Sequence, residues 1–310
     1  MTEIKKSQNS KSGKITGHLY AIIVTAIWSI TYVATDMLLS KGITALQILM
    51  LRFFLALIVL YILKPKLYLP KSFKEELGFA FISLFGMFFY YVFENYAIGQ
   101  TDGTNVAIII SFVPILTTLG SAVFTKRTRI TPLKIAGFVI AISGVVMVVF
   151  NGTVTLDFRI SGYLLAFGAA LCWTVYSVLL EGYLEKFESI IITRRMLIYT
   201  LIVLTPMTLI SDGAPDITLF ANFPVLIGCI ALLGIFGGSL CYHWWNKATQ
   251  RIGVVITTNY LYVSPFITMV FAFFVTGTPI TFMGVCGAVL ILLGVVLSDL
   301  NTSKGIKEAS

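Results

Sequence analysis

Long apolar stretches alternate with short polar breaks along the whole chain. About ten stretches have roughly the 17 to 25 mostly apolar residues that cross a bilayer as an α-helix. We expect these spans at residues 16–39, 44–63, 76–98, 103–125, 133–150, 161–181, 190–210, 222–246, 253–276 and 280–298. Turn-forming segments such as "KPKLYLPKS", "IGQTDGT" and "SDGAPD" separate them. The short alternating strands of a membrane barrel do not appear. The pattern predicts an all-α membrane protein with ten transmembrane helices.

Composition supports a membrane protein and argues against a disulfide or metal framework. Apolar residues make up 57% of the chain and charged residues 12%, with a mean hydropathy of +0.93. Soluble domains carry about 25% charged residues, and one core cannot bury so much apolar surface, so the surplus must face lipid. The four cysteines all fall within predicted spans and form no C-x-x-C pair. We therefore expect no metal site and no cofactor.

The net charge of +8 reflects topology rather than nucleic-acid binding. If the N-terminus is cytoplasmic, the inner segments hold 19 of the 22 Lys and Arg residues: Lys5, Lys6, Lys11, Lys14, Lys64, Lys66, Lys71, Lys74, Lys126, Arg127, Arg129, Lys134, Lys186, Arg194, Arg195, Lys247, Arg251, Lys304 and Lys307. Lys41 and Arg159 fall outside, and Arg52 lies within the second span. By the positive-inside rule both termini are cytoplasmic.

The two halves of the chain repeat one another. "IWSITYVATDMLLSK", from Ile27, and "CWTVYSVLLEGYLEK", from Cys172, both place Trp second, an acid eight residues later and Lys five residues after that. Residues 86–114 also align without a gap with residues 237–265. The matching pairs are Gly86/Gly237, Tyr91/Tyr242, Asn95/Asn246, Ala97/Ala248 and Pro114/Pro265. So ordered a set indicates duplication. We divide the chain into a tail (1–15), a first repeat (16–150), a second repeat (161–298) and a tail (299–310).

Each repeat holds five predicted spans, and five is odd. The second repeat therefore enters the membrane with the opposite orientation, which makes the repeats inverted. Inverted repeats recur in secondary transporters, where the substrate site lies near the bilayer midplane at the repeat interface.

At this point the chain resembles a known family. Ten spans, a Trp in the first, "RFFLAL" in the second and "ENYAIGQTDGTNVAIIISFVP" across the third and fourth resemble the drug/metabolite transporter superfamily, EamA-type branch, over residues 16 to 298. The resemblance implies export of amino acids, other metabolites or toxic compounds; relatives carry nucleotide sugars or sugar phosphates. It also implies a cavity lined by spans one, three, four, six, eight and nine. Many members end spans four and nine with Gly-Glu, but "FTKRTR" and "FVTGTP" stand here.

Polar stripes mark the first and sixth spans. Trp28, Tyr32 and Asp36 are spaced by four residues, which places them on one helix face. The matching stripe of the sixth span is Trp173, Ser177 and Glu181, with Tyr176 beside it. The two acids are either interfacial anchors at helix ends or gate residues that pair alternately as each side closes.

Glu94, in the third span with Tyr91 and Asn95, is the most pointed candidate. An acid within a span is costly and usually faces a cavity or a partner. Burial would favour its neutral form and let it bind and release a proton. The alternative is a structural pair with Arg52, or solvation near the outer end. Arg52 itself either binds an anionic group in its fork geometry, or snorkels or pairs with an acid.

Several further polar residues are candidates for the cavity wall. His243 is a pH sensor, a substrate contact or a membrane anchor, and one His alone does not indicate metal. Asn105, Asn259 and Tyr260 lie early in spans four and nine, where they line a cavity or join helices.

Prolines and glycines suggest where the helices bend and where they pack. Pro114 and Pro265 lie near the middle of spans four and nine and permit kinks, either for gating or as static bends. Spans five and ten are almost without polar residues and carry glycine pairs. We expect them to form a scaffold or a homodimer contact.

The sequence contains no H-E-x-x-H, G-x-S-x-G or Walker motif, so an enzyme is disfavoured. We predict a secondary transporter in the plasma membrane, exporting a small polar or amphipathic metabolite such as an amino acid by alternating access. Its partners are lipid, the small-molecule substrate and, if transport is coupled, protons. The alternatives are a nucleotide-sugar or sugar-phosphate exchanger and, less favoured, a channel or a membrane scaffold.

Overall fold

The computed structural model of the protein describes residues 11–65, 68, 70–101, 103–125, 130–149, 160–277 and 280–299. Helices make up most of these segments, and no strand occurs among them. The predicted tails therefore lie outside the described residues except where residues 11–15 open the first helix and residue 299 ends the last one. The loop residues Lys66, Asp102, Asp157 and Arg159 and the cluster at 126–129 also lie outside them.

The first half contains five helical segments in succession. These are α2 (Lys11–Ser40); α3 (Ala45–Leu63); α4 (Phe73–Ser83), continued by the π-helical η1 (Leu84–Phe89) and α5 (Tyr90–Gln100); α6 (Gly103–Ile110), α7 (Val113–Gly120) and the π-helical η2 (Ser121–Thr125); and α8 (Pro132–Val149).

The second half has the same succession with a short extra helix. It comprises α9 (Ile160–Leu184); α10 (Ser189–Ser211); the extra α11 (Ile217–Asn222); α12 (Val225–Ala231), π-helical η3 (Leu232–Leu240) and α13 (Cys241–Ile252); α14 (Val254–Asn259), 3₁₀-helical η4 (Tyr260–Val263) and α15 (Ser264–Thr276); and α16 (Phe282–Asp299). Eight described helices are long and apolar enough to cross a membrane, and the predicted fifth and tenth spans are the shorter apolar helices α8 and α16.

The predicted end of the eighth span was too early. The apolar stretch stops near residue 246, but helix α13 continues to Ile252 through the amphipathic segment "NKATQRI". It ends at Gly253, whose φ of 83° no side-chain-bearing residue adopts easily. Hydropathy alone missed this last turn because its polar residues lie at a helix end, where water and headgroups solvate them.

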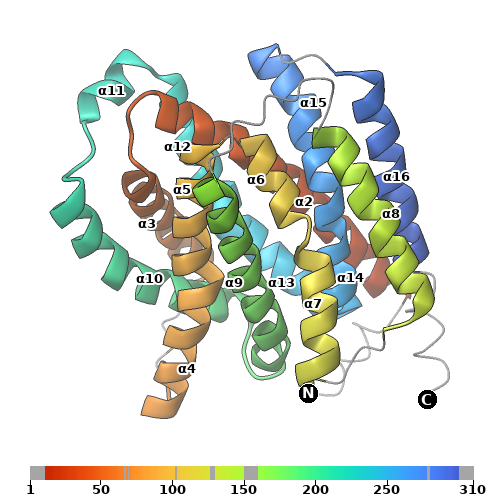
Figure 1. Ribbon diagram of the computed structural model, residues 1–310. Helices are drawn as coiled ribbons and strands as arrows, with labels where there is room; N and C mark the ends of the chain where they lie inside the picture. Colours follow the sequence, from red (N-terminus) through yellow and green to blue (C-terminus); the bar gives the residue numbers. More distant parts are fainter. Residues whose placement is uncertain are drawn as a thin grey trace.

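The two halves run in opposite directions. In Figure 1 the third span rises from α4 to α5, whereas its counterpart descends from α12 to α13; the fourth span descends from α6 to α7, whereas α14 to α15 rises. The contacts between the repeats are symmetric as well. Helix α2 of the first repeat packs on α13 of the second, and the equivalent helix α9 of the second packs on α5 of the first. The described residues therefore form two inverted repeats of five helical segments each, and each repeat packs mainly on the other.

Helices α8 and α16 form a pair at the edge of this bundle (Figure 1). Their glycines meet: a Cβ on Gly144 would lie 2.5 Å from the Gly287 carbonyl oxygen, and one on Gly137 would lie 2.7 Å from that of Gly294. The glycine faces thus join the two repeats within one chain. The outward side chains, such as Val139 and Leu293, are exposed and apolar, as lipid contact requires.

Candidate functional site

A small chamber lies where the two repeats meet. It has a volume of about 20 Å³ and draws its walls from α2, α5, α6, α9, η4 and α15. Its lining residues are Trp28, Thr31, Tyr32, Tyr90, Tyr91, Glu94, Ile110, Trp173, Leu261 and Ser264. A space of this size holds about one water molecule. Any metabolite bound here requires the surrounding helices to move apart.

Aromatic rings enclose most of the chamber. The Trp28 ring lies 5.2 Å from that of Trp173, 5.6 Å from Tyr242 and 5.0 Å from Trp245, all measured between centroids. Tyr90 adds a contact of 4.8 Å to Trp173. Rings at these separations attract one another and present both apolar faces and polar edges. The walls therefore suit a compound with an apolar part.

Two hydrogen bonds from side chains to backbone carbonyl oxygens hold this aromatic cluster in place, one in each repeat. The Trp28 indole N–H donates to the carbonyl oxygen of Gly237 at 3.0 Å. The Tyr242 hydroxyl donates to the carbonyl oxygen of Gly86 at 2.8 Å. Gly86 and Gly237 are equivalent in the repeat, so each half contributes one ring that is anchored on the other half.

Glu94 is the only carboxyl group among the lining residues of the chamber. Its side chain is buried, and the Tyr90 hydroxyl donates to it at 2.6 Å. Tyr90 precedes Glu94 by four residues on α5, which places both on one face. Tyr32 also interacts with the carboxyl group. The carboxyl group thus sits within an otherwise aromatic wall.

Arg52 lies fully buried beside this wall and takes part in none of the ion pairs found among the described residues. Its guanidinium carbon is 4.3 Å from the centre of the Tyr91 ring. Its Nε and Nη2 make no hydrogen bond to any residue that the structure describes. A structural ion pair with Arg52 was one of the alternatives for Glu94. It does not occur among the ion pairs of the described residues, although the two charges interact electrostatically.

A much larger cavity opens at one end of the molecule. It has a volume of about 1100 Å³ and lies between the ends of α3, α9 and α13 and the start of α10. We call it the vestibule; its charged and polar lining residues are Lys64, Glu181, Glu185, Lys186, Glu188, Ser189, His243, Lys247, Thr249 and Gln250. His243 shares a hydrogen bond of 2.6 Å with the Ser189 hydroxyl.

Helix α13 separates the vestibule from the aromatic cluster. His243, Trp244 and Lys247 line the vestibule, whereas Tyr242 and Trp245 are fully buried on the other side. The Tyr176 hydroxyl donates to Asn246 Oδ1 at 3.1 Å, and Asn246 Nδ2 donates to the Thr193 hydroxyl at 3.3 Å. This chain of hydrogen bonds ties α9, α13 and α10 together between the two spaces.

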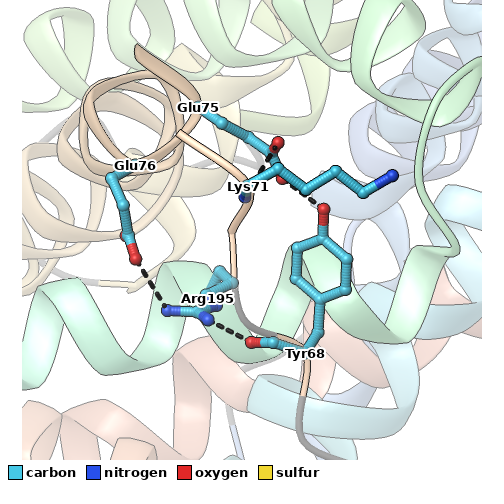
Figure 2. A network of polar contacts seen from close by, with 5 residues as sticks. All are labelled: Tyr68, Lys71, Glu75, Glu76 and Arg195. Atoms are coloured by element: carbon cyan, nitrogen blue, oxygen red, sulfur yellow. Dashed lines mark hydrogen bonds and ion pairs between the residues drawn. The ribbon is translucent and has the colours of Figure 1, made fainter. Parts of the chain in front are cut away.

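The segment between α3 and α4 is tied to α10 at the same end. Figure 2 shows Arg195 donating to the Tyr68 carbonyl oxygen and pairing with Glu76 at 3.4 Å. The Tyr68 hydroxyl donates to Glu75, and burial together with this bond raises the pKa of Tyr68 to about 12. Because that pKa lies far above neutral, the hydroxyl remains a donor at physiological pH. An ion pair between Lys64 and Glu188 adds a second tie.

The opposite end has its own tie between α3 and the end of α10. The Thr44 hydroxyl donates to Asp212 at 2.5 Å, and the Gln47 amide donates to the carbonyl oxygens of Asp212 and Gly213 at 3.3 and 3.4 Å. Thr44 also caps α3, because its hydroxyl accepts the Gln47 backbone N–H at 3.2 Å. Asp36 lies exposed near this end of α2.

The repeated acids Asp36 and Glu181 lie at opposite ends of the bundle, and neither lines the chamber. Glu181 accepts the backbone N–H of Val254 at 3.1 Å and so stabilises the start of α14. It also lines the vestibule. The structure thus gives Glu181 a structural role, and a gating role for either acid stays a prediction.

Spans four and nine are both broken just before their prolines. Helix α6 ends at Ile110 and α7 begins at Val113, with Pro114 in its first turn. Span nine changes to the 3₁₀ segment η4 before α15 begins at Ser264, with Pro265 in its first turn. Leu261, Ser264 and Ile110, which line the chamber, lie at or beside these breaks.

Other candidates lie outside the chamber. Asn95 donates to the Ala45 carbonyl oxygen at 3.4 Å, and Asn259 donates to the Ser298 hydroxyl at 3.4 Å. The Tyr260 hydroxyl shares a hydrogen bond of 2.7 Å with His18. Ser177 is buried and its hydroxyl has no partner; Asn105 is partly exposed in the first turn of α6.

Sequence reasoning missed five lining residues: Thr31, Tyr90, Ile110, Leu261 and Ser264. The apolar Ile110 and Leu261 carry no signal that separates them from other residues of their spans. Tyr90 was detectable, since it lies four residues before Glu94. Thr31 is the repeat counterpart of Tyr176, which was predicted. Ser264 had no signal beyond its place beside Pro265.

Comparison with known proteins defines the class to which this fold belongs. The EamA-like transporter family matches residues 15–150 and again 160–298. The chain therefore belongs to the EamA-like transporter family, with one family unit in each half. A solved crystal structure aligns over 95% of this chain and 99% of its own with a TM-score of 0.74. At 17% identity that likeness shows the fold alone.

Proteins similar to the chain in sequence are named as transporters. The uncharacterized transporter YyaM of Bacillus subtilis (strain 168) is 26% identical over 73% of this chain and 74% of its own length. A protein of Streptantibioticus cattleyicolor, named a probable terminal-alkyne amino-acid exporter, is 26% identical over 73% of each chain. The protein is thus a multi-pass membrane transporter in a lipid environment, acting on a small molecule.

Proposed function

We propose that the protein is a secondary transporter that exports a small amphipathic metabolite, an amino acid being the favoured class, by alternating access. The observation that carries the proposal is the pair of spaces at the repeat interface. A closed aromatic chamber with one carboxyl group lies beside a wide vestibule, and helix α13 separates them. Alternating access by a carrier accounts for this arrangement, because a site that is shielded in one state becomes continuous with a passage to one end when the separating helix moves.

The chemistry of the chamber favours an amino acid. The rings of Trp28, Tyr91 and Trp173 offer apolar contact, and Glu94 offers a partner for an ammonium group. The relative named an amino-acid exporter supports the same class.

We further propose that Glu94 couples transport to protons. A carboxylate buried in a membrane protein is costly unless it is protonated or paired. A substrate ammonium group and a proton would therefore compete for Glu94. A proton that enters from outside would protonate the carboxylate and release the bound substrate to the outside, so the two would move in opposite directions.

The orientation follows from charge. The starts of α4, α8 and α10 and the ends of α9 and α13 lie in the lower half of Figure 1. Lys74, Lys134, Arg195 and Arg251 lie within these helices, and Lys186 lies just after α9. We place this end, both termini and the mouth of the vestibule on the cytoplasmic side of the plasma membrane. A homodimer through α8 and α16 stays a prediction, which native mass spectrometry of the solubilised protein tests.

Counterflow in proteoliposomes tests the proposal. Vesicles are preloaded with one amino acid, nucleoside, sugar phosphate or cationic dye, and uptake of the labelled compound is followed with and without a pH gradient. Accumulation of one or more amino acids is expected. Counterflow of sugar phosphates alone would move the function to an exchanger of that class, and no counterflow of any compound by folded protein would contradict a carrier.

A further inference from the structure

We propose, building on the transport function above, that Arg52 binds the carboxylate group of the transported substrate. With Glu94 in the chamber wall, the site would then select a zwitterion with an apolar side chain. The assignment comes from an unpartnered buried charge and from its absence at the equivalent place in the second repeat.

Arg52 is 1% exposed, yet two of its three guanidinium nitrogens make no hydrogen bond. Buried donors in folded proteins are nearly always paired. A buried charge without a partner costs more still. The guanidinium carbon lies 4.3 Å from the centre of the Tyr91 ring. This cation–π contact positions the guanidinium but does not use its N–H groups as donors. A ligand with oxygen acceptors would satisfy them.

The second repeat shows that the fold does not need this charge. Arg52 is the eighth residue of α3, and Met196 is the eighth residue of α10. Their ends occupy equivalent places: a Cβ on Gly237 would lie 3.2 Å from Arg52 Nη2, and one on Gly86 would lie 2.5 Å from Met196 Cε. A thioether thus fills in one half the place that a guanidinium fills in the other.

Glu94 shows the same asymmetry. Its counterpart in the gap-free alignment of the repeats is Trp245, which is fully buried. Both of these buried charges beside the chamber therefore occur in the first repeat, where the second repeat has apolar side chains. Two costly charges that the duplicated fold can replace with Met and Trp are best explained by what they bind.

The position of Arg52 suits a ligand in the widened chamber. Its Nη2 and the methyl carbon of Thr31 lie at the same distance, 3.2 Å, from a Cβ on Gly237. Thr31 and Tyr91, which carries the guanidinium on its face, both line the chamber. Separation of α2 from η3, which carries Gly237, would therefore open the guanidinium to the space that the rings enclose.

A carboxylate fits better than a phosphate. One guanidinium matches the two oxygens of a carboxylate in its fork geometry. A phosphate dianion would add a second negative charge near Glu94. The lining residues of the chamber include no Lys or Arg to balance it.

Matched ligands test the assignment. For the amino acid with the strongest counterflow, binding is measured together with that of its decarboxylated amine and its deaminated acid. For phenylalanine these probes are phenethylamine and 3-phenylpropionate. In Arg52→Gln, affinity for the amino acid should fall on the order of 30-fold, as for loss of one partner of a buried charge pair. Affinity for the amine should change little, so the variant loses its preference for the carboxylate.

Folding provides the second readout. Arg52→Met, which copies Met196, should insert, fold and unfold at a temperature no lower than the wild type, because it removes an unsatisfied buried charge. Loss of folding in both variants would overturn the assignment, since Arg52 would then be structural. Folded variants that prefer the amino acid over its amine as the wild type does would also overturn it.

These outcomes separate the assignment from the transport function. Wild-type counterflow combined with unchanged ligand preference in Arg52→Gln refutes the role of Arg52 and leaves the carrier in place. Counterflow only of compounds without a carboxylate does the same. Absence of counterflow for every compound refutes the carrier and, with it, the role of Arg52.

Discussion

The indole N–H of Trp28 donates a hydrogen bond to the carbonyl oxygen of Gly237, 209 positions further along the chain. Trp28 belongs to the first repeat and Gly237 to the second, so this bond crosses the interface between them. It anchors the ring at the centre of the chamber wall. If the interface rearranges during transport, this hydrogen bond either breaks or the two groups move together.

Trp28→Phe should therefore weaken both stability and transport. The variant keeps a ring but leaves the Gly237 carbonyl oxygen without its donor, which costs about 1–3 kcal/mol. Thermal unfolding in detergent should occur several degrees lower, and counterflow should slow. Trp244→Phe is the control, because Trp244 stacks on Tyr20 and lines the vestibule without a hydrogen bond of its indole N–H among those described. Equal loss in both variants would contradict the role of the Trp28 bond.

Glu94→Gln should reduce counterflow at least 10-fold while the protein still inserts and folds. The amide keeps the size of the side chain and can accept from Tyr90, but it cannot carry a negative charge or exchange a proton. Any dependence of counterflow on the pH gradient should disappear. Glu185→Gln, in the vestibule wall, is the matched control and should retain both. Wild-type kinetics in Glu94→Gln would return this acid to a structural role.

The helix breaks before Pro114 and Pro265 should affect the rate of the conformational change more than the affinity for substrate. Replacing both prolines with Ala lets spans four and nine form continuous helical hydrogen bonds. Exchange across the membrane should slow several-fold, whereas substrate affinity measured in detergent should stay within about twofold. Unchanged exchange would show that the breaks are static.

Gly144→Ala should destabilise the contact between α8 and α16. A Cβ there would lie 2.5 Å from the Gly287 carbonyl oxygen, a backbone atom that cannot move independently of its helix. The expected cost is roughly 1–3 kcal/mol, as for other overpacked sites. Gly228→Ala is the control, since nothing lies within 4 Å of its Cβ position and its backbone has no positive φ. Thermal unfolding of the two variants gives the comparison.

Cysteine labelling tests the orientation. In a protein without its four native cysteines, Ala214→Cys should react with a membrane-impermeant thiol reagent from outside the cell. Lys74→Cys should react only after permeabilisation. Both positions are exposed and lie at opposite ends of the bundle, beside the ends of α10 and α4 respectively. The reverse pattern would invert the proposed topology.

Much of the architecture could be predicted because the length of each apolar stretch and the internal repeat can both be read directly from the order of the residues. The ranges of the predicted spans and the inversion of the repeats needed no knowledge of tertiary contacts. The chamber was only partly predictable. Trp28, Tyr32 and Glu94 stood out by type and spacing, but the absence of a partner for Arg52 depends on how α3 is rotated against α5 and η3. The vestibule was not predictable, because it arises from the separation of helix ends rather than from any motif.

Alternation between the two ends is tested most directly by labelling a cysteine at each of them. Lys247→Cys lies in the vestibule wall, and Gln47→Cys lies buried at the tie between α3 and the end of α10. Addition of a compound that gives counterflow should change the two labelling rates in opposite directions, because one end opens as the other closes. Rates that rise or fall together, or that do not respond to a transported compound, would contradict alternating access.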